Sequence, residues 1–237
     1  MLRKILRHAL DALDINEKMA AVAMETPVAL RRIAARGMEI GTVIDIGASN
    51  GAWCESAMKV FPGARYLLIE AQPVHEPQLK AFTAAHANTE YVLKAAGEKP
   101  GSVFFDASDP FAGQASDRAA PGLVEVPVTS VDHEIASRNL PGPYLLKFDV
   151  HGFELPILRG AQLALANTNL LVMECYNFEI ASDMLQFPEM CIYMREHGLR
   201  VIDMSEPLWR EKDDALWQMD FFFVRAGRPE FQVNSYR

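Results

Sequence analysis

The chain has 237 residues, with 23 lysines and arginines against 31 aspartates and glutamates, and half of its residues are hydrophobic. This balance is typical of a folded globular protein and excludes a disordered one, and the formal charge of −8 argues against a large nucleic-acid-binding face. Three cysteines without CxxC spacing indicate neither a disulfide framework nor a zinc site.

The N-terminal region, residues 1–39, is predicted to be a helical extension. Apolar residues recur at three- and four-residue spacing from Leu2 to Leu13, and a second helix is predicted over Val28–Arg36. Acidic residues follow the basic N-terminus where a signal peptide needs its apolar stretch, and no run approaches the roughly 18 apolar residues of a membrane span. We therefore expect a cytoplasmic protein without a membrane span.

Residues 40–237 are predicted to form one domain in which strands alternate with helices. Strands are predicted at Thr42–Ile46, Tyr66–Glu70, Tyr91–Ala95, Tyr144–Val150 and Leu170–Glu174, and helices at Gly51–Val60, Glu76–Ala87, Phe153–Ala166 and Phe187–His197. This alternation predicts an α/β fold with a mainly parallel sheet covered on both faces. The last two strands, Val201–Ser205 and Asp220–Arg225, are expected to be antiparallel neighbours, and the turn-rich segment 106–122 is predicted to be a functional lid.

A glycine turn follows the first predicted strand in the segment VIDIGASNG, which contains Asp45, Gly47 and Gly51. Glycines let the backbone turn sharply and approach a ligand closely, and the helix that follows presents free N–H groups. The glycine spacing differs from a dinucleotide fingerprint, and Asp45 suits a ligand with an ammonium group. Glu70 ends the next strand, where a carboxylate can bind both ribose hydroxyls. The pattern favours S-adenosylmethionine over NAD, and the alternative is an ordinary glycine turn beside a strand-end acid.

Four stretches together resemble the FkbM family of class I S-adenosylmethionine-dependent methyltransferases: VIDIGASNG, YLLIEAQP, VPVTSVD with YLLKFDVHGFELPILRGA, and WQMDFFFVR. The most specific is the pattern K-x-D-x-x-G-x-E-x-x-x-L-x-G-A, which runs from Lys147 to Ala161. Over residues 40–225 the resemblance implies a Rossmann-like, seven-stranded, mostly parallel sheet with one antiparallel strand. It also implies a cofactor across the C-terminal ends of the first strands and O-methylation of a sugar, glycan or small natural product. His151 stands where family members often have glutamine.

The predicted site residues follow successive strands, whose carboxyl ends meet at one crevice in such a sheet. The predicted cofactor-binding residues are Asp45, Gly47, Ala48, Ser49, Gly51, Glu70, Ala71, Gln72, Ala96 and Asp149. The predicted catalytic residues are Asp149, His151 and Glu154, with Asp149 or His151 receiving the hydroxyl proton. Two alternatives stay open: Glu154 as a charge that complements a helix N-terminus, and His151 as a turn residue that moves no proton.

Other functions remain as alternatives. Asp149, His151, Glu174 and Asn177 are an oxygen-rich set that suits a divalent metal, although a metal-free site is favoured. A non-catalytic binding or scaffold protein is the main rival, and an NAD-dependent oxidoreductase is disfavoured by the glycine spacing. The expected partner is a small-molecule or glycan acceptor and not a nucleic acid. A homodimer is compatible with the sequence, which does not fix the oligomeric state.

Overall fold

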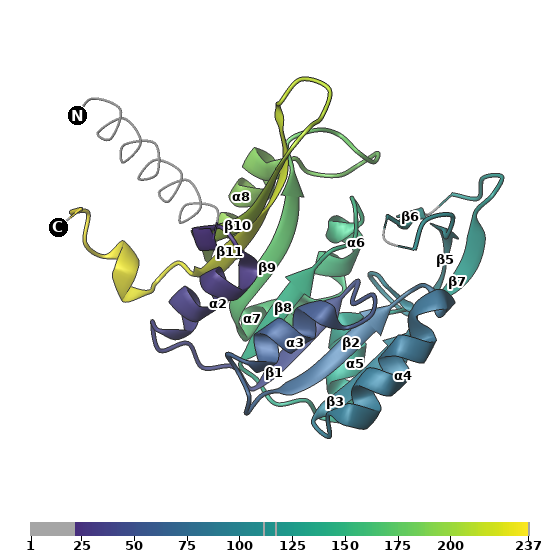
Figure 1. The fold of residues 1–237 in the computed structure, drawn as a ribbon, viewed down its shortest axis with the longest axis horizontal. Helices are drawn as coiled ribbons and strands as arrows, with labels where there is room; N and C mark the ends of the chain where they lie inside the picture. The colour runs from purple at the N-terminus through teal and green to yellow at the C-terminus, as the bar shows by residue number, and fades with distance from the viewer. Residues whose placement is uncertain (1–21, 111, 117, 237) are drawn as a thin grey trace, which may run out of the picture.

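The computed structural model describes residues 22–110, 112–116 and 118–236, and its main element is a seven-stranded sheet (Figure 1). The strands follow the order β10-β11-β9-β8-β1-β2-β3. Their bounds are β1 Thr42–Ile46, β2 Arg65–Glu70, β3 Thr89–Leu93, β8 Tyr144–Phe148, β9 Thr168–Tyr176, β10 Leu199–Trp209 and β11 Leu216–Arg225. Strand β11 is antiparallel to both neighbours, and the other neighbouring pairs are parallel. The predicted α/β class with one antiparallel strand is confirmed.

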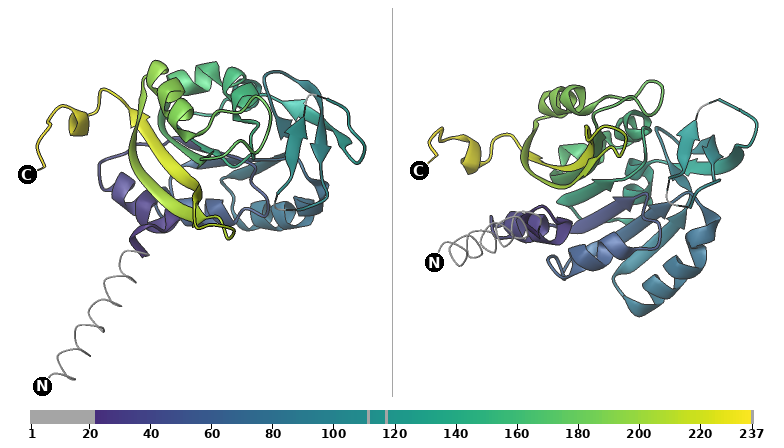
Figure 2. Two further views of the ribbon diagram at one scale, coloured as in Figure 1. Left: turned by 90° about the horizontal axis from the view of Figure 1, so that it is seen from above. Right: turned by 45° about the horizontal axis from the view of Figure 1, so that its top comes forward.

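Helices cover both faces of this sheet (Figure 2). One face carries α2 Thr26–Ala34, α3 Ala52–Met58 and α4 Glu76–Ala85, and the other carries α5 Val131–Arg138, α6 Glu154–Arg159, α7 Gln162–Ala166 and α8 Phe187–Glu196. Short 3-10 helices lie at η1 Pro73–His75 and η2 Pro229–Phe231. Successive strand residues point to opposite faces, so β1 places Val43 in the core beneath α2 to α4 and Ile44 in the opposite core. Burial on both faces explains the nearly continuous apolar strands.

The N-terminal helix α2 lies against β10 at one edge of the sheet. The guanidinium of Arg32 donates two hydrogen bonds of 2.8 Å to Asp203, and the backbone N–H of Thr26 donates to Glu206 at 2.8 Å. The predicted helix at Val28–Arg36 is thus present, but it begins and ends two residues earlier, at Thr26 and Ala34. The predicted helical run from Leu2 lies outside the described residues. Within the described part of the chain, no helix has the length and apolar character needed to cross a membrane.

A second, four-stranded sheet lies beside the main one and was not predicted. Its order is β4-β7-β5-β6, with β4 Ala95–Ala96, β5 Gly101–Asp106, β6 Gln114–Ser116 and β7 Val124–Thr129. Val103, Phe105, Val126 and Val128 form its small core. The prediction that 106–122 is a turn-rich segment without a strand is therefore corrected, because β6 lies within it and pairs with β5.

The predicted helix Phe153–Ala166 is divided into α6 and α7 at Gly160. Two backbone N–H groups at the start of α7 donate to the carboxylate of Asp132, at 3.0 and 2.8 Å. Asp132 therefore caps a helix other than its own, and this cap fixes the start of α7. The carbonyl of Gly160 accepts a hydrogen bond of 3.0 Å from the backbone of Asp132, so the break is anchored on both sides.

Substituting Gly160→Ala is expected to lower the free energy of unfolding by about 1–3 kcal/mol, the usual cost of overpacking. A Cβ at this position would lie 2.1 Å from the carbonyl oxygen of Gly97, which is backbone and unable to rotate away. Gly63→Ala is the matched control, since nothing lies within 4 Å of a Cβ there. Urea denaturation of both variants measures the difference. Equal unfolding free energies for the two would contradict the tight contact at Gly160.

Candidate active site

The glycine turn after β1 is held between the ends of two neighbouring strands. The N–H of Gly47 donates to the carbonyl of Ile69 at 2.9 Å, and the N–H of Asp149 donates to the carbonyl of Ile46 at 3.0 Å. Gly47 has φ +76°, and a Cβ on it would lie 2.0 Å from the carbonyl oxygen of Asp149. Only glycine fits this conformation and this close approach. The turn therefore lies where the ends of β1, β2 and β8 meet. This agrees with the expectation that the carboxyl ends of parallel strands form one crevice, called here the strand-end rule.

A cavity, called here the sheet-end cavity, opens over these strand ends. Of the predicted residues, those that line it are Gly47, Ser49, Glu70, Ala71, Gln72, Ala96, Asp149 and His151. Its apolar walls include Ile69, Ala95, Val150 and Ile157. Apolar walls with a few polar groups at the rim are the usual composition of a small-molecule site.

Glu70 is the buried acid of this rim. One of its carboxylate oxygens accepts the N–H of Ser49 at 2.7 Å, and the other accepts the N–H of Gln72 at 2.8 Å. These two bonds fix the orientation of the carboxylate. A carboxylate has about four lone-pair sites, so each oxygen keeps capacity for one further donor from a ligand.

Asp45 lies behind the sheet-end cavity and is not among its lining residues. Its side chain points to the same face as Val43, beneath α3, and is completely buried. The thiol of Cys54 donates to one oxygen at 3.2 Å, and Lys147 Nζ lies 3.8 Å from the other. Burial, the largest effect, raises the pKa of Asp45 to about 6. The structure thus places Asp45 away from the position expected for a contact with a ligand's ammonium group.

Ala48 and Gly51, like Asp45, lie behind the sheet-end cavity. Both are buried in the turn and are not among the cavity-lining residues, and a Cβ on Gly51 would lie 3.0 Å from the ring of Phe82. These two residues shape the turn from behind.

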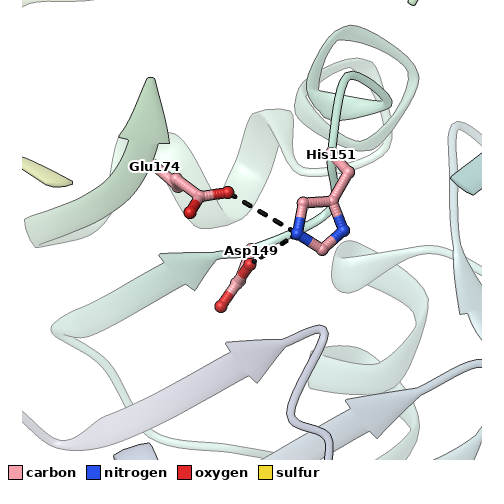
Figure 3. Close-up of side chains that lie close together, drawn as sticks. All are labelled: Asp149, His151 and Glu174. Carbon is pink, nitrogen blue, oxygen red and sulfur yellow. Dashed lines mark ion pairs between the residues drawn. The ribbon is translucent and has the colours of Figure 1, made fainter. Parts of the chain in front are cut away.

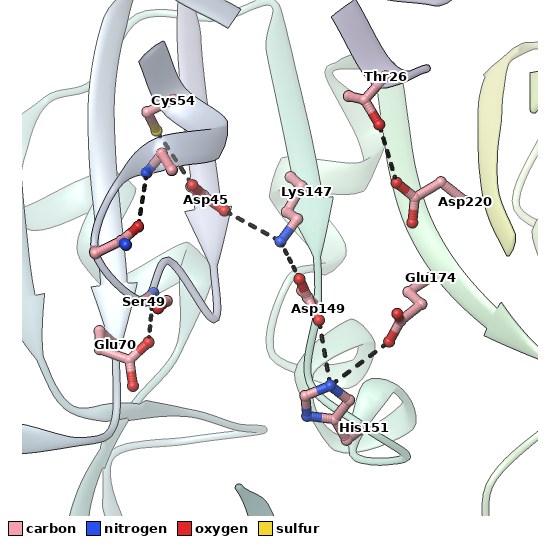
Figure 4. A network of polar contacts seen from close by, with 12 residues as sticks. Thr26, Asp45, Ser49, Cys54, Glu70, Lys147, Asp149, His151, Glu174 and Asp220 are labelled. Atoms are coloured by element: carbon pink, nitrogen blue, oxygen red, sulfur yellow. Dashed lines mark hydrogen bonds and ion pairs between the residues drawn. The ribbon is translucent and has the colours of Figure 1, made fainter. Parts of the chain in front are cut away.

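Lys147 connects Asp45 to Asp149 (Figure 4). Its Nζ lies 2.7 Å from Asp149 Oδ2, and its side chain is 5% exposed. Burial acts to lower the pKa of Lys147, but the charges of Asp149 and Asp45 outweigh it and raise that pKa above its ordinary value. Likewise, burial acts to raise the pKa of Asp149, but Lys147 holds it below its ordinary value. The ammonium group therefore keeps Asp149 ionised.

Asp149, His151 and Glu174 point toward one another (Figure 3). Asp149 and His151 follow β8, and Glu174 lies in β9. His151 has φ +50°, and its Nε2 lies 3.5 Å from Asp149 Oδ1 and 3.7 Å from Glu174 Oε2. Burial, followed by the charge of Asp149, raises the pKa of Glu174 to about 8. These three side chains are called the Asp–His–Glu group below.

Two other predicted residues are placed elsewhere. Glu154 is buried at the start of α6, where it accepts the N–H of Gly152 at 2.9 Å, and it does not belong to the lining of the sheet-end cavity. This position corresponds to the alternative of a helix-terminal charge. The side-chain amide of Asn177 donates to the carbonyl of Leu216 at 3.3 Å. The amide nitrogen of Asn177 is thus directed to β11.

A second cavity, called here the acidic cavity, opens on the other side of Asp149. It is lined by Thr26, Pro27, Ala52, Trp53, Ser56, Lys147, Asp149, Glu174, Glu206, Gln218 and Asp220. Burial, the largest effect, raises the pKa of Asp220 to about 6. Sequence reasoning missed Asp220, although a charged residue inside the apolar run MDFFFV was a usable signal. Asp149 lines both cavities and therefore stands at their junction.

The family model of the methyltransferase FkbM domain matches residues 45–201. The chain belongs to the FkbM methyltransferase family. No curated protein matches it.

Several solved structures resemble this FkbM chain at low sequence identity. The methyltransferase FkbM from Methylobacillus flagellatus has 18% identity and a TM-score of 0.47, and the match covers 76% of this chain but only 43% of that protein. The precorrin-6y C5,15-methyltransferase from Geobacter metallireducens has 11% identity and a TM-score of 0.44, and the match covers 85% of this chain and 90% of that protein. The 1,6-didemethyltoxoflavin-N1-methyltransferase from Burkholderia thailandensis has 12% identity and a TM-score of 0.45, and the match covers 94% of this chain and 88% of that protein.

In this FkbM chain the segment after β5 covers the sheet-end cavity. The side-chain amide of Gln72 donates to the carbonyls of Asp109 and Pro110, both at 3.1 Å. His75 Nε2 lies 2.8 Å from the Pro110 carbonyl, and His151 Nδ1 lies 3.3 Å from the Gly113 carbonyl. Gln72 thus contributes to the cavity while holding the segment over it.

Proposed function

We propose that this protein transfers the methyl group of S-adenosylmethionine to a hydroxyl of a sugar, glycan or small natural product. The observation that carries the proposal is the junction of the two cavities. Glu70 lines the sheet-end cavity, and the Asp–His–Glu group separates this cavity from the acidic one. A donor in the first cavity and an acceptor in the second would therefore meet at Asp149.

The residues of the sheet-end cavity fit the proposed cofactor. Glu70 retains acceptor capacity for the two ribose hydroxyls, and Ala95 and Ala96 leave space for a ring between apolar walls. The tight turn at Gly47 brings the backbone close to the cavity. Asp149, rather than the buried Asp45, supplies a carboxylate near a cationic ligand, because Asp149 lines the cavity.

When bound, S-adenosylmethionine supplies a methyl group on a sulfonium sulfur that leaves as a neutral thioether. The acceptor oxygen forms the bond to the methyl carbon, the C–S bond breaks, and its electron pair stays on sulfur. In our proposal the Asp–His–Glu group orients the hydroxyl and takes up its proton. Glu174 and Asp149 flank His151 Nε2 and stabilise the positive charge that a proton brings. Positioning contributes most of the remaining acceleration.

The cofactor assignment is tested by isothermal titration calorimetry with S-adenosylmethionine and S-adenosylhomocysteine. Glu70→Gln is expected to weaken binding of both about 10–100-fold, because hydrogen bonds to a charged group contribute about 1.5–3 kcal/mol. Glu55→Gln is the control, since Glu55 is exposed on α3. If the wild-type protein bound neither compound, the enzyme proposal would be wrong. Binding without turnover across a panel of hydroxylated acceptors would favour the scaffold alternative.

A further inference from the structure

The geometry of the Asp–His–Glu group points to a site for one divalent cation. We infer that Asp149 Oδ1, His151 Nε2 and Glu174 Oε2 bind an ion of the Mn²⁺ type, with its open positions toward the acidic cavity. The three side chains each offer one donor atom, and these atoms all lie within 4.8 Å of one another. The inference about the ion stands on this geometry, and only its consequence for the acceptor rests on the proposed function.

The spacing within the group suits a shared ion better than direct hydrogen bonds. The two separations from Nε2, 3.5 and 3.7 Å, are at or beyond the limit of a hydrogen bond. Donor atoms about 2.0–2.2 Å from one metal ion lie about 3.0 Å apart at octahedral angles and about 3.5 Å apart at tetrahedral angles. Small side-chain rotations would bring the three atoms onto one ion.

The histidine tautomer supports the same reading. His151 Nδ1 faces the carbonyl oxygen of Gly113, which can only accept, so Nδ1 carries the hydrogen of the neutral ring. In this tautomer the lone pair of Nε2 faces two carboxylate oxygens, an arrangement that a cation between the three atoms stabilises. Metal-binding histidines commonly donate their other ring N–H to a backbone carbonyl in this way.

The surrounding side chains hold both carboxylates in place. Lys147 binds Asp149 Oδ2 and leaves Oδ1 directed at His151. Gln218 donates to Glu174 Oε1, and the hydroxyl of Tyr176 donates to Oε2, the same oxygen that faces His151. Supporting hydrogen bonds of this kind orient metal-binding carboxylates.

Two carboxylates and one imidazole suit Mn²⁺, which accepts oxygen ligands and tolerates a nitrogen. An ion in octahedral coordination with three protein ligands has about three further positions. Asp149 and Glu174 line the acidic cavity, whereas Asp149 and His151 line the sheet-end cavity. Open positions on the side of Glu174 would therefore face the proposed acceptor. The expected acceptor class is therefore one with two adjacent oxygens, such as a vicinal diol. With the ion bound, His151 Nε2 is a ligand and no longer takes up the hydroxyl proton. The cation then makes the coordinated hydroxyl more acidic, and so replaces the imidazole in that role.

The test is a titration of the cofactor-free protein with Mn²⁺, followed by electron paramagnetic resonance and by calorimetry. One ion per chain is expected, with affinity at least about 100-fold lower in Glu174→Gln and in His151→Asn. Each variant is also unfolded by heat to separate loss of the ion from loss of structure, and Mn²⁺ is expected to raise the Tm of the wild type only. Zn²⁺ and Mg²⁺ are titrated as competitors.

Two control variants separate coordination from general attraction to acidic residues. Asp220→Asn removes a charge from the acidic cavity without removing a ligand, and we expect it to lower Mn²⁺ affinity less than about 10-fold. Asp213→Asn, at an exposed ion pair, is expected to change Mn²⁺ affinity less than about twofold. Absence of stoichiometric binding of all three metals, or equal losses in Asp220→Asn and Glu174→Gln, would overturn the inference. Cofactor binding is measured separately, so failure of the ion site and failure of the proposed function are distinguishable.

Discussion

Replacement of His151 by asparagine is expected to lower kcat for methyl transfer about 10²–10⁴-fold at saturating S-adenosylmethionine. The imidazole lies between Asp149 and Glu174 at the junction of the two cavities, and no other ring nitrogen belongs to this group. Asparagine is the appropriate replacement because φ at this position is +50°, a left-handed conformation that asparagine tolerates better than alanine. The variant thus removes the ring without straining the turn.

The rate is measured as release of S-adenosylhomocysteine, with the acceptor that gives the highest turnover in a panel of sugars, glycosides and phenols. His133→Asn provides the matched control, because His133 is an exposed histidine on α5. Calorimetry of each variant with S-adenosylhomocysteine separates loss of chemistry from loss of cofactor binding. Turnover of His151→Asn within about threefold of the wild type would show that the imidazole takes no part in the reaction.

The Lys147→Met variant is expected to lose about 3–5 kcal/mol in free energy of unfolding at pH 7, the usual result of removing one partner from a buried ion pair. Lys147 is the counter-charge of both Asp45 and Asp149, and Asp45 is completely buried. Methionine keeps the length of the side chain, so the loss reports charge and not a cavity. Lys59→Met, on the exposed end of α3, is expected to change stability little.

The deficit of Lys147→Met should shrink as the pH falls from 7 toward 4. Burial already raises the pKa of Asp45 to about 6 in the presence of Lys147, and loss of the ammonium raises it further. The native state of the variant therefore binds a proton more tightly than the unfolded state does, so its stability falls as pH rises through the native pKa and recovers as Asp45 is protonated. Urea denaturation at pH 7 and pH 5 measures this difference, and a deficit equal at both values would contradict it.

Much of the main sheet was predictable because its strands are buried on both faces and end in recognisable residues. The apolar run before Asp45, the acid Glu70 at the end of the next strand and the K-x-D pattern at Lys147 each located a strand end. The second sheet was missed because its strands are short and its core is small. The break at Gly160 depends on a contact with Gly97, which lies 63 residues earlier in the chain and leaves no local signal.

The candidate site was predictable where the strand-end rule applies and not elsewhere. The positions of Glu70, Asp149 and Glu174 follow from parallel strands whose carboxyl ends meet at one edge. Asp220 lies on the antiparallel strand β11, whose amino-terminal half reaches that edge, so the rule does not find it. For Asp45, residue type gave the right strand end but not the face toward which its side chain points.

Because α2 packs against β10, the two cavities are lined by residues from different parts of the sequence. The sheet-end cavity is built from residues inside the matched range 45–201, whereas Thr26, Glu206, Gln218 and Asp220 of the acidic cavity fall outside it. Substitutions in α2 or in the facing parts of β10 and β11 therefore alter the acidic cavity and leave the sheet-end cavity unchanged. Under the proposed function, such substitutions would change acceptor choice while the methyl-donor site stays constant.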